Sequence, residues 1–247
     1  MASVYDEKEL RRFFVDKTEK PTMRVTGNEY KHLAEVLRAR VGDKIILCPN
    51  DGRDYVYEAV AFDKSSVTLS YIDDYENDTE PRLNLSVFLS LLKGDKTEFA
   101  VQKLTELGVK KIFPFIGEYT VRNSEKSDRL RRAAHEASKQ CGRAIIPEVF
   151  ETIKFADVPH MLDGYDTVVF AYEGAYATGK RLGDVVRKND KNIALIVGPE
   201  GGFSEAEVGI MTDNGYTSVT LGKRILRAET ASVAGAAVIM QLAGEWE

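Results

Sequence analysis

Strand-like and helix-like segments alternate along the chain from residue 85 onward, and this alternation restricts the possible folds more than any other feature of the sequence. The strand-like runs are largely apolar and comprise Leu85–Leu92, Lys111–Ile116, Thr167–Tyr172, Ile193–Val197 and Ser218–Leu221. The helix-like segments are Lys96–Leu107, Ser124–Cys141, Ser204–Asn214 and Glu229–Leu242. Near-continuous apolar strands are typical of parallel sheets that are buried on both faces. The pattern therefore predicts an α/β fold with a mainly parallel sheet covered by helices.

The beginning of the chain has a different pattern, in which short strands follow one another with little helix between them. We expect these strands at Arg12–Val15, Met23–Thr26, Lys44–Cys48, Asp54–Phe62 and Val67–Ile72. One helix is expected from about Asn28 to Ala39, and Asp51-Gly52 between two of the strands is a hairpin signal. Closely spaced short strands of this kind predict a small β-barrel-like module.

The acidic segment Asp73–Arg82 separates the two patterns. It reads DDYENDTEPR, contains a proline and lacks apolar periodicity, which is typical of a linker between domains. The sequence therefore predicts two domains, a β-rich domain over residues 1–74 and an α/β domain over residues 75–247.

Cysteine, histidine and apolar content restrict the class of protein. Cys48 and Cys141 show no paired spacing, which indicates reduced thiols, and the three histidines are scattered, so we expect no metal site. The first nine residues do not resemble a signal peptide. The apolar run Val233–Met240 is too short to span a bilayer. These features predict a cytoplasmic protein that is not embedded in a membrane.

The charge of the chain is unevenly distributed. The net charge is −5, which is not typical of a nucleic-acid-binding protein. Between Arg122 and Arg143, however, seven Lys and Arg residues stand against three Asp and Glu residues. This segment either meets an RNA backbone or forms a solvated helix face, and charge alone does not decide between the two.

The segment Ile193–Ser204 carries an apolar strand into a glycine-rich loop, VGPEGGF, and then into a helix, at whose start Ser204 and Glu207 are expected to form a capping box. Ligands of open parallel sheets bind beyond the carboxyl ends of the strands, so we expect a ligand at this loop. The loop fits neither the P-loop nor the dinucleotide fingerprint, and Glu200, Glu205 and Glu207 would repel a pyrophosphate. A ligand without phosphate that carries a positive sulfonium fits better. The alternative is a tight strand-to-helix turn that binds no ligand.

The segment Val219–Ala231 is the second unusual one. A short strand ends at Gly222, and the chain then stays apolar through Ile225 and Leu226 while it carries Arg227 and Glu229. Charged groups flanked by apolar residues at a strand end tend to be paired or functional. We expect the two glycine-bearing turns to lie at neighbouring strand ends and to form one phosphate-free pocket.

Both segments resemble the cofactor-binding signatures of a known family. VGPEGGFSEAE and LGKRILRAETA are similar to the paired motifs of the RsmE family, which comprises uracil-N3 methyltransferases of small-subunit ribosomal RNA within the SPOUT superfamily. RRFFV, HLAEVLR, KTEFAVQKLTELGVKKIFPF and KQCGRAIIPEV resemble family segments in the same order, so the resemblance covers nearly the whole chain. The chain departs from the family at Ser124–Arg132, where a tryptophan often precedes the helix.

The resemblance implies the fold and the partners. It implies a PUA-like N-terminal β-barrel joined to a SPOUT domain whose C-terminal segment is threaded as a trefoil knot. The cofactor would be S-adenosyl-L-methionine, and the substrate 16S ribosomal RNA, naked or in the assembled small subunit. Family members act as homodimers, and the small-residue helix Thr230–Leu242 is a reasonable dimer surface.

The resemblance also implies which residues form the site. For catalysis we hypothesise that Arg227 stabilises negative charge developing on the uracil oxygens, and that Glu229 either accepts the proton or orients Arg227. The target base would leave any stack to reach them. The cofactor would contact Gly198, Glu200, Gly201, Gly202, Leu221, Gly222, Ile225, Leu226 and Ala231. Candidates for RNA contact on both domains are Arg11, Arg12, Arg38, Arg40, Lys103, Arg122, Arg131, Arg132, Gln140 and Arg143.

Two other functions remain open at this point. A nucleotide-dependent α/β oxidoreductase is disfavoured because the dinucleotide fingerprint is missing and the loop is acidic. A non-catalytic RNA-binding or assembly factor on the same fold is opposed only by the intact C-terminal motifs.

Overall fold

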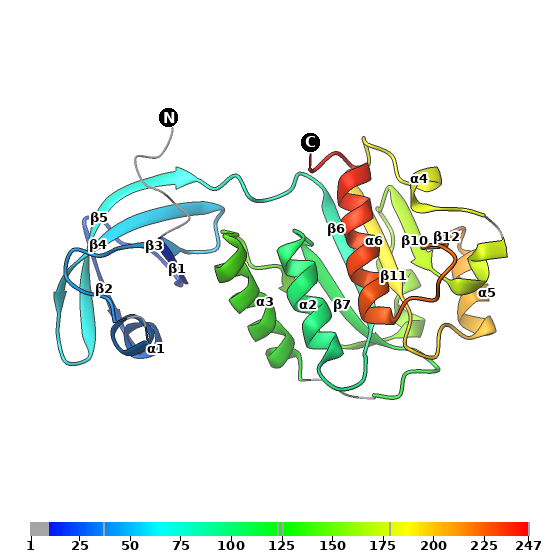
Figure 1. Ribbon diagram of the computed structural model, residues 1–247, viewed down its shortest axis with the longest axis horizontal. Helices are drawn as coiled ribbons and strands as arrows, with labels where there is room; N and C mark the ends of the chain where they lie inside the picture. The colour runs from blue at the N-terminus through cyan, green and yellow to red at the C-terminus, as the bar shows by residue number, and fades with distance from the viewer. Residues whose placement is uncertain (1–9, 37, 123, 125, 178, 247) are drawn as a thin grey trace. The chain divides into compact units, whose positions relative to one another are not determined.

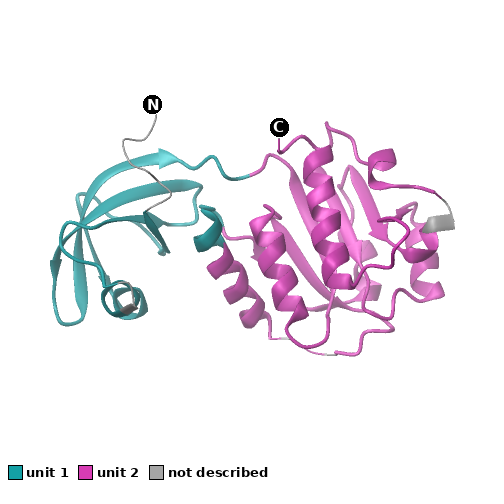
Figure 2. Ribbon diagram, in the orientation of Figure 1, with its two compact units in different colours: residues 1–80, 138–145 teal, residues 81–137, 146–247 magenta. Residues whose placement is uncertain are grey.

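The computed structural model describes residues 10–36, 38–122, 124, 126–177 and 179–246, so the acidic N-terminus and position 37 of the expected first helix lie outside the described residues. The chain forms two compact units (Figure 2). The first comprises residues 1–80 and 138–145, and the second comprises residues 81–137 and 146–247. The second unit contains both glycine-bearing turns.

The first unit is built on a five-stranded sheet in the order β1-β3-β4-β5-β2. Its strands are β1 (Arg11–Phe14), β2 (Thr22–Thr26), β3 (Lys44–Cys48), β4 (Arg53–Phe62) and β5 (Ser66–Glu76). The pair β1–β3 is parallel and the other pairs are antiparallel. Among the described residues no ladder joins the edge strands β1 and β2, so the hydrogen bonds do not close the expected barrel. The first helix is α1 (Gly27–Lys31), and it continues as a π-helical segment, His32–Val36.

β5 is longer than the sequence pattern predicts. It continues through Glu76, with Asp74 paired to Tyr55 and Glu76 paired to Arg53 across the ladder with β4. The domain boundary expected after residue 74 thus falls inside a strand. Two cations offset the charge of Asp74 within the strand: its carboxylate accepts hydrogen bonds from Lys20 and Arg53, and a further one from the hydroxyl of Tyr71.

Asp74 should make the stability of the first unit depend on pH. Hydrogen bonds from Lys20, then Tyr71 and Arg53, hold the pKa of Asp74 well below its ordinary value. Because the folded pKa is lowered, this stabilisation is present above the unfolded pKa of about 3.9 and is lost as the pH falls. Asp74→Asn should therefore cost on the order of 1 kcal/mol at pH 6, and the difference from wild type should shrink toward pH 3. The free energy of opening of β4 and β5, measured by hydrogen exchange in urea at pH 6 and pH 3, gives the difference between wild type and variant. Asp73→Asn is the control on the same strand. A difference that is equal at both pH values would contradict this role.

A buried polar cluster ties β1 to β3 and β4. The guanidinium of Arg12 forms a two-pronged ion pair with Asp54, and the two side chains are only 8% and 1% exposed. Arg12 Nη1 also donates to Cys48 Sγ at 3.0 Å, and Asn77 Nδ2 donates to Asp54 Oδ2 at 2.9 Å. Arg12 is therefore part of the interior of the first unit. This position disfavours the expected contact between Arg12 and RNA.

The thiol of Cys48 should be unreactive in the folded protein. Burial, together with the nearby Asp54 carboxylate, raises the pKa of Cys48 to about 12, although Arg12 acts in the opposite direction. Only the thiolate reacts, so alkylation of Cys48 by iodoacetamide at pH 8 should be at least about 100-fold slower than in urea. The measurement uses Cys141→Ser protein and mass spectrometry. Equal rates in the folded and unfolded chain would contradict the assignment.

The second unit is built on a seven-stranded sheet whose main path is β12-β10-β11-β6-β7-β8, with β9 paired to β7 (Figure 1). The strands are β6 (Asn84–Ser90), β7 (Lys111–Ile116), β8 (Glu148–Val149), β9 (Ile153–Lys154), β10 (Thr167–Ala171), β11 (Asn192–Val197) and β12 (Thr217–Val219). The helices are α2 (Lys96–Glu106), α3 (Ser127–Cys141), α4 (Leu182–Val185), α5 (Glu205–Asp213) and α6 (Ala228–Leu242); the last residues of α3, from Ser138, are counted with the first unit. Every pairing in this sheet is parallel, which confirms the predicted α/β class. The threading of a knot stays a prediction.

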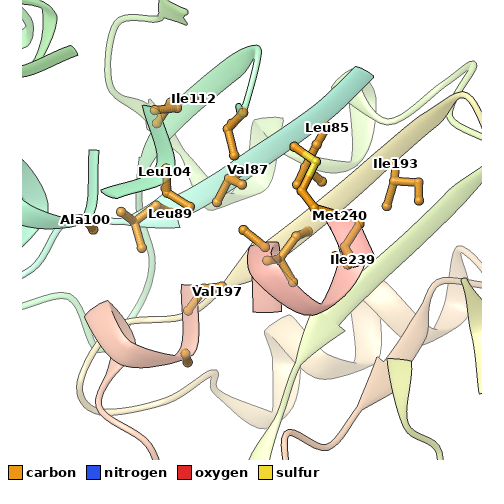
Figure 3. Packing of buried hydrophobic residues seen from close by; sticks show 14 of the residues in the cluster. Leu85, Val87, Leu89, Ala100, Leu104, Ile112, Ile193, Val197, Ile239 and Met240 are labelled. Atoms are coloured by element: carbon orange, nitrogen blue, oxygen red, sulfur yellow. The ribbon is translucent and has the colours of Figure 1, made fainter. Parts of the chain in front are cut away.

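Alternating side chains of the central strands enter two separate cores. On β11, Ile193, Leu195 and Val197 face one core, whereas Ala194 and Ile196 face the other. The first core also receives Leu85, Val87 and Leu89 from β6 and is covered by α2 and α6 (Figure 3). The second core is rich in phenylalanine, with Phe88, Phe113 and Phe150 stacked in a row. The apolar runs of the sequence arise because both faces of the sheet are buried.

The small residues of α6 allow close packing inside the second unit. A Cβ at Gly235 would lie 3.0 Å from Leu195 Cδ2, so α6 approaches β11 too closely for a larger side chain. Ala231, Ser232 and Ala236 on the same helix are also buried. The small-residue face of α6, which was expected to form a dimer surface, thus packs largely against the sheet and α2, although Val238 remains 44% exposed.

Candidate active site

The loop after β11 is shaped by contacts within its own unit. Gly198 is buried, and a Cβ there would lie 3.1 Å from the ring of Phe203; a Cβ at Gly201 would lie 2.8 Å from Tyr119 Cβ. Gly202 has a φ of +77°, which L side chains rarely adopt. Packing and backbone conformation therefore account for these glycines, as the alternative of a tight turn predicts. They do not exclude a ligand, because the loop lies at the carboxyl edge of the sheet.

The capping box predicted at the start of α5 is present and has a further partner. Ser204 Oγ accepts the N–H of Glu207 at 3.2 Å, and Glu207 Oε2 accepts the N–H of Ser204 at 3.0 Å. Glu207 Oε1 also accepts the N–H of Glu118 at 2.8 Å, which ties the loop after β7 to this loop. The carboxylate of Glu207 is thus committed to structure, whereas Glu205 is exposed.

The second glycine-bearing turn is more open. Gly222 has a φ of +115°, and a Cβ there would meet nothing within 4 Å. Ile225 is 85% exposed, while Leu221 and Leu226 are half-buried and pack against the first core. Arg227 is the N-cap residue of α6, and its exposed side chain makes no capping hydrogen bond. Within the described part of the chain, no ion pair involves Arg227.

The strands that lead into the two turns are not neighbours. β10 lies between β11 and β12 in the sheet, so the expectation of neighbouring strand ends is wrong. Two other features join the segments. The loop after β10 approaches both, because a Cβ at Gly202 would lie 3.1 Å from Glu173 Oε1 and the N–H of Tyr172 donates to Val219 O at 3.1 Å. α6 also returns across the sheet to β11 and β6.

Lys96, in the first turn of α2, connects the two motifs directly. Its Nζ lies 3.7 Å from Glu200 Oε1 and 3.5 Å from Glu229 Oε1. Glu200 Oε1 also accepts the N–H of Lys93 at 3.0 Å. Sequence reasoning did not single out Lys96, although its place just after a buried strand put it at the carboxyl edge of the sheet. The ion pairs bring both motifs into one site.

One atom of this site has no hydrogen-bond partner in the described structure. Glu229 Oε2 is buried and accepts no hydrogen bond there. A buried acceptor without a donor costs free energy, so such an atom is often completed by a ligand or water. Glu229 therefore pairs with Lys96 through one oxygen, and its other oxygen is buried without a hydrogen bond among the described residues.

The expected RNA-contacting residues differ in exposure. Arg11, Arg38, Arg132 and Gln140 are exposed, and Arg122 is half-buried and donates to the carbonyls of Gly94 and Ser124. Lys103 forms an ion pair with Glu106 at 2.8 Å. Arg143 is only 2% exposed and forms a two-pronged ion pair with Glu80 at 2.8 and 2.9 Å. Like Arg12, Arg143 is held inside the first unit, which disfavours direct RNA contact.

Neither a metal-ligand cluster nor a helix able to span a bilayer occurs in the described ranges of the chain.

Known families match both units of the chain. A model described as an RNA methyltransferase domain matches residues 79–240, and one described as an RNA methyltransferase PUA domain matches residues 25–70. The parallel sheet with its paired loops and the small β-rich unit thus define the class: an RNA methyltransferase domain preceded by a PUA domain.

Individual relatives resemble the chain over nearly its whole length. Ribosomal RNA small subunit methyltransferase E of Bacillus subtilis is 32% identical over 237 residues, which covers 90% of this chain and 93% of the relative. A crystal structure of the enzyme of the same name from Neisseria gonorrhoeae, bound to S-adenosyl methionine, is 29% identical with a TM-score of 0.88 and covers 96% of this chain and all of its own. A Legionella pneumophila methyltransferase with bound cofactor is 25% identical with a TM-score of 0.86, over 94% of this chain and 97% of its own. The chain belongs to the ribosomal RNA small subunit methyltransferase E family.

Proposed function

We propose that the protein transfers a methyl group from S-adenosylmethionine to N3 of a specific uridine in 16S ribosomal RNA. Membership of the family supports methylation of ribosomal RNA with this cofactor. The observation that carries the proposal is the junction at Lys96, which joins the GPEGG loop to the start of α6 in one site. The assignment of the target nucleoside as uridine, and of the methylated atom as N3, is supported by the resemblance of the two motifs to those of the family.

The residues at the carboxyl edge of the sheet fit a phosphate-free cation. Glu200, Glu229 and Lys96 together carry one net negative charge, which favours a sulfonium over a pyrophosphate. Backbone and apolar groups of the two turns would hold the cofactor, and the exposed Ile225 offers it apolar surface. These residues are Gly198, Glu200, Gly201, Gly202, Leu221, Gly222, Ile225 and Leu226 of the turns, together with Ala231 near the start of α6. When bound, the cofactor supplies an electrophilic methyl group on a sulfonium.

Arg227 and Glu229 would carry out the chemistry on the base. Uracil N3 is a poor nucleophile while it holds its imide proton, so that proton must leave as the new bond forms. We assign the proton to Glu229 Oε2, because this carboxylate pairs with Lys96 and not with Arg227. The N3 electron pair then forms the bond to the methyl carbon, and the electrons of the broken S–C bond remain on sulfur. Arg227 would stabilise negative charge that develops on the uracil oxygens.

RNA contact would rest on the exposed or half-buried members of the expected set, namely Arg11, Arg38, Arg40, Lys103, Arg122, Arg131, Arg132 and Gln140. Binding through phosphate contacts should weaken as salt is added. We also propose that the protein acts in the cytoplasm as a homodimer, for which the exposed Val238 of α6 offers apolar surface on the second unit.

The decisive experiment identifies the methylated base. Purified protein is incubated with labelled S-adenosylmethionine and either naked 16S ribosomal RNA or small subunits from cells that lack this enzyme, and the RNA is digested for mass spectrometry. We expect about one label per RNA, in N3-methyluridine. Label in another nucleoside would disprove the N3 assignment, and cofactor binding without transfer to either substrate would favour an assembly factor.

A further inference from the structure

Lys96 lies at the centre of three segments that are far apart in the sequence. It follows β6 and begins α2, Glu200 follows β11, and Glu229 lies in the first turn of α6. All three residues belong to the second unit. Their side chains are 34%, 22% and 12% exposed, respectively, so the cluster is shielded from solvent mainly on the side of Glu229.

The geometry is that of a bridge between two carboxylates. The distances from Lys96 Nζ to Glu200 Oε1 and to Glu229 Oε1, 3.7 and 3.5 Å, are nearly equal, and both exceed a normal hydrogen bond. The ammonium is thus shared between the carboxylates. Without it, two like charges would face each other at a partly buried position, which destabilises their approach.

Each carboxylate of the bridge has a further structural feature that bears on the proposed reaction. Glu200 also accepts the N–H of Lys93, so it fixes the loop after β11 to the turn after β6. Glu229 leaves Oε2 buried without a partner in the described structure. The bridge therefore connects the loop expected to hold the methyl donor with the atom expected to receive the proton.

We propose that Lys96 is a positioning residue, which holds Glu229 in the orientation that presents Oε2 to the base and locks the start of α6 to the loop after β11. The role rests on the proposed function, because it acts through Glu229. In this role Lys96 acts through its ion pairs and not through contact with the substrate. Precise placement of a reacting group strongly affects rate, because a displacement of about 1 Å costs on the order of 100-fold in turnover.

Three variants separate this role from a general effect of charge. Lys96→Met removes the ammonium and keeps most of the side-chain length, and Lys96→Arg keeps the charge. Lys191→Met is the matched control, since exposed Lys191 precedes β11 at the opposite end of that strand from Glu200. We expect Lys96→Met to lower kcat about 10- to 100-fold with KM for RNA changed less than about threefold, whereas Lys96→Arg recovers most of the loss and Lys191→Met behaves as wild type.

A second readout does not depend on activity. Hydrogen exchange of the cofactor-free protein should be faster in Lys96→Met at residues 198–203 and 227–231, and unchanged in β7. If Lys96→Met fails to fold, Glu200→Gln breaks one half of the bridge and should speed exchange at residues 198–203 alone.

The outcomes distinguish the two proposals. Wild-type kcat and wild-type exchange in Lys96→Met would overturn the positioning role and leave the proposed function intact. A wild-type protein that transfers no methyl group would refute the function, and unchanged exchange in the variant would then refute the bridge as well. A loss of activity that Lys96→Arg does not recover, with exchange unaltered, would also overturn the positioning role.

Discussion

Replacing Arg227 with alanine should lower kcat about 100- to 1,000-fold, the range observed when one preorganised donor to a developing anion is removed. Cofactor affinity should change less than about threefold, because an interaction made only in the transition state does not contribute to ground-state binding. The substitution should leave the fold intact. Arg227 is exposed and makes no capping hydrogen bond through its side chain, and its carbonyl still accepts the N–H of Ala231 at 2.7 Å.

The measurement combines single-turnover methylation of ribosomal RNA with calorimetric titration of S-adenosylmethionine. Arg224→Ala is the matched control, because Arg224 is an exposed arginine three residues earlier in the same segment. It removes the same charge from the same loop. If Arg227→Ala weakened cofactor binding and left turnover at saturation unchanged, Arg227 would be a binding residue and the role in charge stabilisation would be wrong.

The α/β fold of the second unit could be predicted because the spacing of apolar residues along each segment reflects which of its faces are buried. Apolar residues at successive positions of β6 and β11 indicate burial of both faces, and the structure divides them between two cores. The capping box at Ser204 was equally readable, because it depends on local spacing alone. Features of this kind are fixed by a few consecutive residues.

Pairings between residues far apart in the chain could not be predicted from the sequence in the same way. The acidic run in β5 resembles a linker until Lys20 and Arg53 are seen to offset Asp74. The order of the strands, with β10 between β11 and β12, has no local signal. Arg12 and Arg143 look like surface charges for the same reason, since their partners Asp54 and Glu80 are 42 and 63 residues away.

The candidate site contains features of both kinds, those that local sequence reveals and those that depend on long-range pairing. Both glycine-bearing turns were found from their composition, because a strand end followed by glycine is a local pattern. Lys96 was missed, since its importance comes from two carboxylates that lie 104 and 133 residues further along the chain, at positions 200 and 229. A charged residue in the first turn of a helix that follows a buried parallel strand lies at the carboxyl edge of the sheet, as the neighbouring loops do, and is a candidate site residue for the same reason.

The burial of Arg12 leads to the largest expected effect on stability. Arg12→Ala should destabilise the first unit by about 3–5 kcal/mol, because it leaves the carboxylate of Asp54 buried without its cation. For a unit of this size the loss corresponds to a lower unfolding midpoint by on the order of 15 °C or more. Differential scanning calorimetry with hydrogen exchange in β3 and β4 would measure the change.

Two further variants test whether Arg12 acts through structure or through RNA. The double variant Arg12→Met/Asp54→Asn removes both charges and keeps an oxygen for Asn77, so it should recover most of the lost stability. Arg11→Ala, on the exposed side of the same strand, should weaken RNA binding and its dependence on salt, with a much smaller loss of stability than Arg12→Ala because no buried carboxylate loses its cation. The opposite result, with Arg12→Ala as stable as wild type but weaker in RNA binding, would show that the guanidinium leaves Asp54 to meet the RNA.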